Sequence, residues 1–257
     1  MEVRAKKALG QHFLTDRKVA RAIVDSLSGG LPALEVGPGM GVLSQYLLQR
    51  DDIDLRLVEI DSESVAYLLT HFPDIQGKLI EADFLKLSLD ELFPEKFNII
   101  GNFPYNISSQ IFFKILDHKD SIPEVVCMIQ KEVAERIAEP PGSKTYGILS
   151  VLLQAWYDIE YLFTVDEHVF NPPPKVKSGV VRLMRNDVTD LGVDERMFKR
   201  LVKLSFGQRR KMLRSSLKSV FMADPSVMER DVFRQRPEQL GVEDFIALTE
   251  LATSIAR

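Results

Sequence analysis

Three short apolar segments of this chain end in a polar side chain that could do chemistry. Glu59 closes "LRLVE", Asp83 follows "KLIEA", and Asn102 follows "FNIIG". A carboxylate at Glu59 can accept hydrogen bonds from both hydroxyls of a ribose, and one at Asp83 can accept from the exocyclic amine of an adenine. Each acid taken alone also fits a helix cap or a turn. Taken together, the two acids and the amide suit recognition of nucleosides and placement of an amine.

A glycine-rich turn, "VGPGMG", precedes these residues and brings Gly37, Gly39 and Gly41 between a predicted strand and a predicted helix. Glycines there let the backbone approach a ligand closely. The third glycine comes too early for a G-x-G-x-x-G dinucleotide motif, no G-K-[ST] follows, and Pro38 removes one backbone N–H. These features argue against NAD and ATP. With Glu59 about 20 residues downstream of the turn, they favour an adenosine cofactor without a phosphate chain, S-adenosylmethionine.

The tetrapeptide "NFPY" stands where a target amine would meet that cofactor. The Asn102 side-chain oxygen and a backbone carbonyl near Phe103–Pro104 can accept the two amine hydrogens, Pro104 fixes the backbone, and Tyr105 offers a face to a purine. Methyl transfer to a neutral amine depends on positioning more than on a strong base. A simple turn after a strand is the alternative interpretation of the same residues.

The elements that must position these residues alternate along the chain. Short apolar runs predict buried strands, and intervening segments with apolar residues at helical spacing predict helices. The predicted strands are 33–36, 55–60, 78–82, 97–102 and 124–130, and the predicted helices are 42–50, 62–72 and 107–118. This alternation predicts a doubly wound α/β sheet, whose ligands bind at the carboxyl ends of the strands.

The pattern changes after residue 156. Segments 157–165 and 176–184 predict an antiparallel pair of strands at the sheet edge, joined by the stiff "FNPPPKV" connection. The segments 194–206, 208–221 and 242–256 are helical in pattern. We therefore expect a methyltransferase domain over 1–185 and a small all-helical domain over 186–257.

Composition excludes several other classes. No apolar run approaches the roughly 20 residues needed to span a bilayer, and the N-terminus lacks a secretory signal. The single cysteine, Cys127, excludes an internal disulfide and a multi-thiolate zinc site, and the four histidines lie far apart. We expect a cytoplasmic protein with no membrane contact and no metal.

Positive charge gathers in one stretch although the formal net charge is −4. Residues 201–219 hold six Lys or Arg and no acid. Such a local basic patch suits contact with phosphates at chosen places, and a solvated helix face is the alternative.

With these motifs the chain resembles the KsgA/RsmA family of ribosomal RNA adenine dimethyltransferases nearly end to end. The segments that carry the resemblance are "KKALGQHFLTD", "LEVGPGMGVLS", "VEID", "EADF", "GNFPYNIS", "FNPPPKVKSGVVRL" and "GQRRKMLRSSLK". The resemblance implies a Rossmann-like class I methyltransferase sheet followed by a small helical domain. It also implies S-adenosylmethionine-dependent dimethylation of the N6 amines of two adjacent adenosines. These lie in the 3′-terminal hairpin loop of 16S ribosomal RNA, in the small subunit or its precursor, and we expect the protein to act as a monomer.

The resemblance also assigns residues. Those that it places against the cofactor, together with Gly39 of the turn, are His12, Leu14, Gly37, Glu59, Asp83 and Asn102. Phe170 matches the aromatic that packs on the target base, beside the catalytic group Asn102, Pro104 and Tyr105. The residues expected to hold the RNA backbone are Arg209, Arg210, Lys211 and Arg214. Two positions depart from the family pattern, His12 where Asn is frequent and Phe103 where Leu is frequent.

Three other functions share parts of this pattern. A large-subunit ribosomal RNA adenine methyltransferase of the antibiotic-resistance type has the same pocket and tetrapeptide. A DNA adenine methyltransferase is disfavoured because no separate target-recognition domain is visible. A non-catalytic ribosome assembly factor would keep the fold without the chemistry, against which the glycine turn, Glu59, Asp83 and Asn102 all argue.

Overall fold

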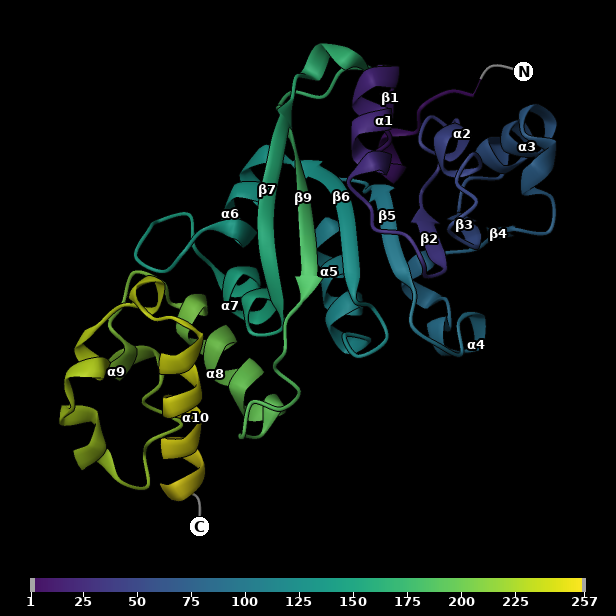
Figure 1. Cartoon of the computed structure of the whole chain (residues 1–257). Helices are drawn as coiled ribbons and strands as arrows, with labels where there is room; N and C mark the ends of the chain where they lie inside the picture. Colours follow the sequence, from purple (N-terminus) through teal and green to yellow (C-terminus); the bar gives the residue numbers. More distant parts are fainter. Residues whose placement is uncertain (1–2, 256–257) are drawn as a thin grey trace. The chain divides into compact units, whose positions relative to one another are not determined.

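The computed structural model of this chain describes residues 3–255 and divides it into two compact units. The first unit comprises Met1–Ala134 and Asp158–Arg185, and the second comprises Glu135–Tyr157 and Asn186–Arg257. Figure 1 shows the ribbon coloured along the sequence, with the elements of each unit labelled.

A mixed seven-stranded sheet forms the centre of the first unit, with strand order β4-β3-β2-β5-β6-β9-β7 (Figure 1). The strands from β4 to β6 pair in parallel, and β9 pairs antiparallel with β6. The strands are β2 (Ala33–Val36), β3 (Leu55–Glu59), β4 (Leu79–Glu81), β5 (Asn98–Asn102), β6 (Glu124–Gln130), β7 (Tyr157–Val165) and β9 (Ser178–Arg185). The predicted α/β class is confirmed.

The sequence of the central strands explains their place in the sheet. All four residues of β2 and six of the seven in β6 are buried, as expected for parallel strands covered on both faces. Cys127 lies inside β6, where burial raises the pKa of its thiol, so it is a packing residue. The strand order reverses beside β2, because β3 and β4 lie on one side of it and β5 and β6 on the other. A crevice for ligands is expected at such a reversal.

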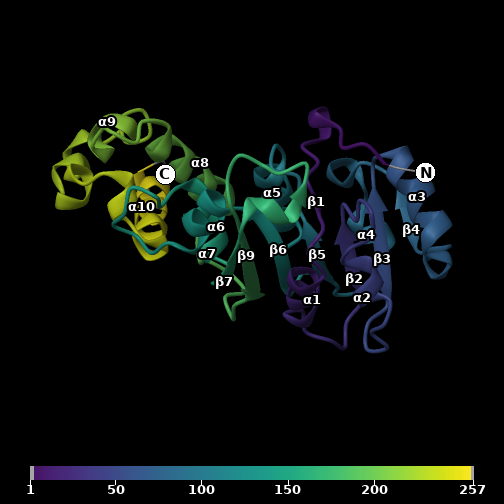
Figure 2. The ribbon, with the colours of Figure 1, turned by 90° about the horizontal axis from the view of Figure 1, so that it is seen from above.

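Helices of the first unit cover both faces of the sheet. They are α1 (Arg17–Asp25), α2 (Ser44–Leu47), α3 (Ser62–His71), α4 (Leu89–Leu92), α5 (Ser108–Asp117) and the start of α6 (Lys131–Ala138). Seen from above, α1 and α5 lie on opposite sides of the sheet (Figure 2). Helix α1 begins after Asp16, whose carboxylate accepts the N–H groups of Lys18 and Val19 and so caps the helix.

A two-stranded sheet that the sequence does not predict joins distant parts of the first unit. Strands β1 (Phe13–Leu14) and β8 (Phe170–Asn171) pair antiparallel, and the Thr15 N–H donates to the Val169 carbonyl at 2.8 Å. The N-terminal segment is thereby tied to the residues just before the proline run. The expected strand pair at the sheet edge is present as β9 and β7, whose arrows point in opposite directions in Figure 1.

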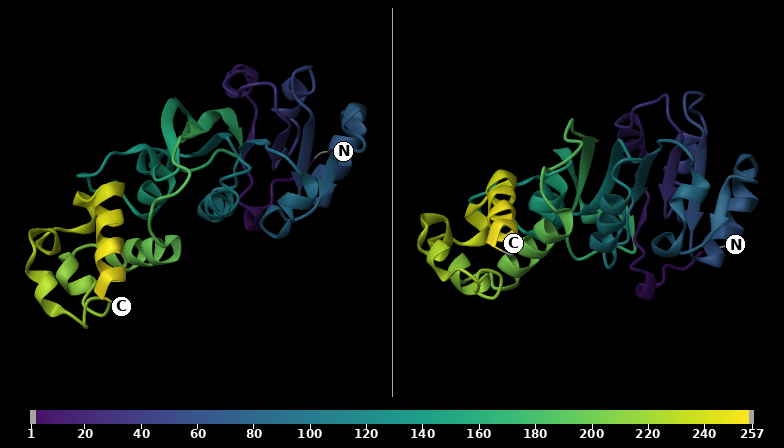
Figure 3. Two further views of the ribbon diagram at one scale, coloured as in Figure 1. Left: turned by 60° about the horizontal axis from the view of Figure 1, so that its bottom comes forward. Right: turned by 90° about the horizontal axis from the view of Figure 1, so that it is seen from below.

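The second unit is built from helices and turns, and its segment from residue 186 onward is green to yellow in Figure 3. Its helices are α7 (Ile148–Gln154), α8 (Glu195–Gly207), α9 (Leu213–Ser216) and α10 (Val242–Ile255). Its core contains packed aromatic rings, among them Phe221 and Phe233 with centroids 4.9 Å apart at 82°, and Phe206 and Phe245 at 6.1 Å.

The second unit differs from the sequence expectation in two ways. Residues 135–157, expected in the first domain, group with the second unit because α7 contacts α8 and α10. The helix expected over 208–221 is reduced to the single turn of α9. Helix α8 ends at Gly207, and the Leu213 N–H donates to the Gln235 carbonyl at 2.9 Å instead of continuing a helix. Ala256, the last residue of the third expected helix, lies outside the described residues.

Within residues 3–255, no helix is long and apolar enough to cross a membrane. The same residues contain no group of three or more His, Cys, Asp or Glu side chains placed to hold a metal ion.

Candidate active site

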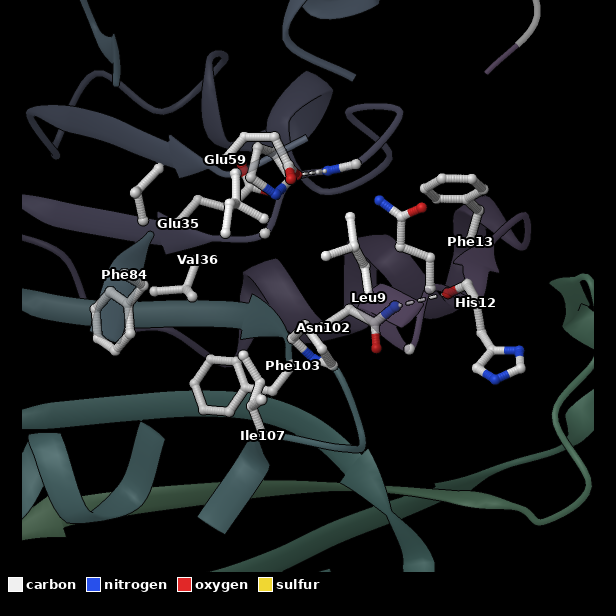
Figure 4. Close-up of a pocket in the computed structure, with 18 of the residues that line it drawn as sticks. Leu9, His12, Phe13, Glu35, Val36, Glu59, Phe84, Asn102, Phe103 and Ile107 are labelled. Carbon is white, nitrogen blue, oxygen red and sulfur yellow. Dashed lines mark hydrogen bonds between the residues drawn. The ribbon is translucent and has the colours of Figure 1, made fainter. Parts of the chain in front are cut away.

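A cavity of about 220 Å³ lies in the first unit, at the carboxyl ends of β2, β3, β4 and β5. It adjoins the reversal of strand order beside β2, the expected place for a ligand in a doubly wound sheet. Figure 4 shows residues of its lining, with Glu35 and Glu59 near one end, Asn102 and Phe103 centrally, and Leu9, His12 and Phe13 on the N-terminal segment.

The glycine turn forms one wall of this cavity. Gly37 and Gly39 have φ values of 68° and 55°, in the left-handed region that favours glycine. A Cβ on Gly39 would lie 3.0 Å from two atoms of the Phe13 ring, so a side chain there would have to displace that ring. The turn therefore presents bare backbone to the cavity, in keeping with close approach of a ligand.

Glu59, at the end of β3, is held in place by two backbone donors. The Gly39 N–H donates to its Oε2 atom and the Asp61 N–H to its Oε1 atom, each at 3.0 Å. The side chain is only 4% exposed, and burial raises the pKa of its carboxyl although both backbone bonds oppose that shift. Each carboxylate oxygen keeps lone-pair capacity for a further donor, as two ribose hydroxyls would require.

Asp83 lies on the cavity wall after β4 and also serves the turn that follows. Its Oδ1 atom accepts the Leu85 N–H at 2.9 Å, and its Oδ2 atom lies 3.8 Å from the Lys86 ammonium. The two interpretations of this acid, turn cap and ligand, are therefore compatible, because Asp83 also lines the cavity.

Glu35, inside β2, lines the same cavity and was not singled out from the sequence. Its side chain is 1% exposed, and its Oε2 atom accepts the Ser44 hydroxyl at 2.6 Å. Burial raises the pKa of Glu35 to about 8, and the nearby Glu59 charge adds to that rise. The signal in the sequence was an acid inside the apolar run "ALEV", directly before the glycine turn.

Asn102, the last residue of β5, has one end of its side-chain amide fixed. Its Nδ2 atom donates to the main-chain carbonyl of His12 at 3.1 Å, as the dashed line in Figure 4 shows. The Oδ1 atom therefore carries the acceptor function toward the cavity that Asn102 lines. An acceptor held in this way can orient an amine without moving.

The rest of the tetrapeptide is anchored by its backbone. Phe103 is 1% exposed, packs edge-on against Phe112 at 6.0 Å, and donates its N–H to the Met128 carbonyl at 3.0 Å. The Pro104 carbonyl accepts the Ile107 N–H at 3.2 Å, so it is engaged in the local turn. The Phe103 carbonyl is the better candidate for a backbone acceptor in the site.

Tyr105 and His12 form a stacked pair beside Asn102. Their ring centroids are 5.4 Å apart with 29° between the planes. The Tyr105 hydroxyl is hydrogen-bonded to the Ser178 hydroxyl, and burial raises the pKa of Tyr105. His12 Nδ1 lies 2.9 Å from the Pro172 carbonyl, so this nitrogen must carry the ring proton to donate. The ring that lies on Tyr105 in this structure is thus His12.

Phe170 is in a different environment. It is 4% exposed in β8, opposite Leu14 of β1, and belongs to the hydrophobic core of the first unit. Leu14 lines the cavity, whereas Phe170 is not among the lining residues. Contact between Phe170 and a target base would require this aromatic ring to leave its buried position.

Most sequence-predicted site residues converge on this one cavity. Those that line it are His12, Leu14, Gly37, Gly39, Glu59, Asp83, Asn102, Pro104 and Tyr105. The predicted RNA-contacting residues belong to the second unit, where Arg210, Lys211 and Arg214 are exposed. Arg209 differs from them, because its Nη2 atom donates to the carbonyls of Lys144 and, at 2.9 Å, of Tyr146.

A doubly wound sheet, a bare glycine turn after β2 and polar groups at the ends of β3, β4 and β5 together define a class I methyltransferase, an enzyme that uses S-adenosylmethionine. A family model described as ribosomal RNA adenine dimethylase matches residues 2–237 of the chain. This chain belongs to the ribosomal RNA adenine dimethylase family.

Two curated relatives, each named ribosomal RNA small subunit methyltransferase A, are similar over nearly the whole chain. The protein from Parabacteroides distasonis is 60% identical over 249 residues, which cover 96% of this chain and 93% of that protein. The protein from Porphyromonas gingivalis is 57% identical over 255 residues, 98% of each chain.

Solved structures share the fold. A dimethyladenosine transferase from Plasmodium falciparum aligns with a TM-score of 0.79 and 24% identity, covering 95% of this chain and 98% of that one. The 23S rRNA methyltransferase ErmE aligns with a TM-score of 0.63 and 26% identity, covering 93% and 99%. These alignments confirm the Rossmann-like α/β fold that the sequence predicts.

Proposed function

We propose that this enzyme transfers methyl groups to the N6 amines of two adjacent adenosines in the 3′-terminal hairpin loop of 16S ribosomal RNA. The RNA would be presented in the small ribosomal subunit or its precursor, which links the reaction to subunit biogenesis. The relatives that are 57–60% identical bear a small-subunit name, which supports this substrate. The observation on which the chemistry rests is the fixed amide of Asn102 in a cavity suited to an adenosine cofactor.

S-adenosylmethionine fits the residues that line the cavity. The bare backbone at Gly37 and Gly39 would accommodate its close approach. Glu59 would accept hydrogen bonds from the ribose hydroxyls, and Asp83 would accept one from the adenine amine. His12 and Leu14 close the cavity from the N-terminal side. When bound, the cofactor supplies an electrophilic methyl group on a sulfonium.

The residues of this chain act on the amine rather than on the methyl group. Asn102 Oδ1 and the Phe103 carbonyl accept the two N6 hydrogens, so the nitrogen lone pair points along the line of attack. Pro104 and the buried Phe103 side chain keep that carbonyl in place. Bound S-adenosylmethionine would give up its methyl group to the nitrogen with loss of the carbon–sulfur bond, and the surplus N6 proton would leave to solvent. No covalent enzyme intermediate is needed.

The target base stacks on the face of Tyr105 that His12 does not cover, and Ser178 holds the Tyr105 hydroxyl. Recognition of an unstacked loop base by an aromatic face is the usual mode for single-stranded RNA. Phe170 supports the cavity wall at Leu14, its partner in the pairing of β8 with β1. The exposed Arg210, Lys211 and Arg214 hold RNA phosphates, and the enzyme works as a monomer in the cytoplasm.

The test is to incubate the enzyme and labelled S-adenosylmethionine with small subunits that lack the modification, and to map the methylated bases. Two adjacent dimethylated adenosines near the 3′ end of the small-subunit RNA are expected. Label on large-subunit RNA or on DNA would select another substrate, and no label with intact binding to the subunit would indicate an assembly factor.

A further inference from the structure

The N-terminal segment that we call the strap, residues 6–12, forms part of the cavity wall without belonging to the large sheet. It contains a 3₁₀ turn, Lys7–Leu9, that ends at Gly10 with a φ of 63°. Every residue from Ala8 to Leu14 lines the cavity. In Figure 4, Leu9, His12 and Phe13 lie on one side of the pocket and Val36 and Phe84 on the other. A ligand in the cavity would therefore be enclosed in part by the strap.

The strap is fastened to Asp61, two residues after Glu59, by residues on both sides of its turn. The Lys6 ammonium forms an ion pair with Asp61 Oδ1 and lies 3.0 Å from Glu63 Oε1. Gln11 Nε2 donates to Asp61 Oδ2 at 3.3 Å, and the Lys6 N–H donates to Gln11 Oε1 at 2.8 Å. Both ends of the turn thus meet the same carboxylate.

The backbone of the strap is also held by the tetrapeptide and Asn106, which follows it. Asn106 Nδ2 donates to the Ala8 carbonyl at 3.3 Å, and Asn102 Nδ2 donates to the His12 carbonyl at 3.1 Å. A Cβ on Gly10 would lie 2.5 Å from Asn106 Oδ1, so the strap packs closely on this loop. The strap therefore spans from the strand end that carries Glu59 to the one that carries Asn102.

The contacts with Asp61 include the charged one, and Asp61 is hydrogen-bonded to Glu59, the proposed cofactor-binding acid. Asp61 is 3% exposed, and burial alone would raise the pKa of its carboxyl. The hydrogen bonds from Lys6, Ser64 and Gln11 outweigh that effect and lower it. The Asp61 N–H also donates to Glu59 Oε1 at 3.0 Å. Loss of the Lys6 charge would leave Asp61 buried with fewer donors and the strap with one charged contact fewer.

We propose that Lys6 is a positioning residue that keeps the strap closed through Asp61 and so retains the cofactor in its pocket. This role rests on the proposed function, because the retained ligand is S-adenosylmethionine. Removal of the ion pair opens the strap more often, and the bound cofactor leaves faster. The amine-orienting groups stay in place once the cofactor is saturating.

The experiment compares Lys6→Met, Lys6→Arg and Lys7→Met with the wild type. Lys7 is the matched control, because it is the neighbouring lysine of the same turn and its side chain is exposed. The dissociation constant and dissociation rate of S-adenosylmethionine are measured by calorimetry and stopped-flow displacement. Lys6→Met should raise both about 10-fold, the scale for a partly exposed hydrogen bond between charged groups. Lys6→Arg should stay close to the wild type, and Lys7→Met should match it.

Two further readouts separate a strap from a general loss of stability. Hydrogen exchange of residues 6–12 should rise in Lys6→Met, while exchange in β2 and β5 stays unchanged. With saturating cofactor, kcat should fall by less than about 2-fold, because the amine site is untouched. In a cycle with Asp61→Asn, the double variant should bind no more weakly than the weaker single variant.

Equal cofactor dissociation from Lys6→Met and the wild type would overturn the role of Lys6 while leaving the proposed function intact. So would fully additive effects of Lys6→Met and Asp61→Asn. A wild-type enzyme that binds no S-adenosylmethionine would overturn both proposals.

Discussion

The pocket of the first unit and the basic segment 209–214 of the second unit use charge in opposite ways. In the pocket, Glu35 and Glu59 are 1% and 4% exposed, and each is bound by donors of the protein. In the basic segment, Arg210, Lys211 and Arg214 are exposed to solvent. The pocket holds its acids in a fixed geometry, which costs free energy because the acids lose contact with water. The basic segment keeps its cations accessible to a polyanion.

Because of this contrast, the pocket and the basic segment should be sensitive to different solution conditions. Buried acids with a raised pKa couple their protonation to folding, so the pocket should respond to pH. Exposed cations lose their effect on phosphates as counterions compete, so the basic segment should respond to salt. The fixed amide of Asn102 carries no charge, so its role should depend on neither pH nor salt. Its loss should lower the rate of methyl transfer.

The largest effect is expected from Asn102→Ala. The substitution removes the Oδ1 acceptor for the amine and should lower the rate of methyl transfer about 100- to 1,000-fold, the range found for loss of one preorganised polar group. Cofactor affinity should weaken only several-fold. Single-turnover methylation of unmodified small subunits measures the rate, and calorimetry measures the affinity.

Asn106→Ala is the matched control for that change. Asn106 also donates to a carbonyl of the strap, that of Ala8, but it is not placed to meet the amine in the proposal. A rate for Asn106→Ala near the wild-type value would assign the Asn102 effect to the amine. Full turnover by Asn102→Ala would contradict the proposed mechanism.

The next effect concerns Glu35 and pH. Burial raises the pKa of Glu35 from 4.5 to about 8, so the folded protein keeps a proton that the unfolded chain has lost. Stability should therefore fall as pH rises between these values, by up to about 1.4 kcal/mol per pH unit, and level off above pH 8. Glu35→Gln keeps an acceptor for Ser44 and should remove this part of the slope. Urea unfolding between pH 5 and pH 8 measures it.

Glu81→Gln provides the comparison, since Glu81 is an exposed acid in β4. It should leave the dependence of the unfolding free energy on pH unchanged. If Glu35→Gln and the wild type lose stability in parallel from pH 5 to pH 8, Glu35 does not retain its proton in the folded enzyme.

A smaller effect is expected from Glu59→Gln on cofactor affinity. The amide nitrogen would face the N–H of Gly39 or of Asp61, where the carboxylate now accepts from both. The dissociation constant for S-adenosylmethionine should rise about 10- to 100-fold, with a smaller change in kcat at saturation. Glu81 pairs with Glu59 in register across β3 and β4, so Glu81→Gln again serves as control. A 100-fold loss of kcat with unchanged affinity for S-adenosylmethionine would mean that Glu59 acts on the target base and does not bind the cofactor.

The sequence predicts the central strands and the residues at their carboxyl ends well, and there are physical reasons for this. Apolar runs, glycine turns and the acids or amides after them are local signals, so Glu59 and Asn102 could be placed at one edge of the sheet. The β1–β8 pairing could not be predicted, because two-residue strands have no periodicity. The burial of Phe170 and the raised pKa of Glu35 likewise depend on neighbours distant in sequence.

The second unit shows the same limit. Nothing in "GQRRKML" distinguishes Arg209 from Arg210, and both fit a helix with a basic face. Only the fold brings the segment 143–146 to Arg209, whose guanidinium then bonds backbone carbonyls there. Those contacts and the bond from Leu213 to Gln235 replace the expected helix with turns. A residue's charge predicts that it can bind phosphate, whereas its neighbours decide whether it is free to do so.

The smallest effect, and the one that tests this distinction, is expected in the basic segment. Arg210→Glu with Lys211→Glu should weaken binding to the small subunit about 10-fold at moderate salt and make its salt dependence shallower, because two phosphate contacts are lost. Thermal stability should stay the same, since both side chains are exposed.

Arg209→Ala should have the opposite effects. It removes donors to the Lys144 and Tyr146 carbonyls, so the second unit should melt at a lower temperature while the salt dependence of RNA binding is preserved. Filter binding across a salt series and thermal melts of the same variants measure both. Unchanged affinity in the double variant would show that this face is merely solvated. A salt dependence that becomes shallower in Arg209→Ala as well would mean that Arg209 also contacts RNA.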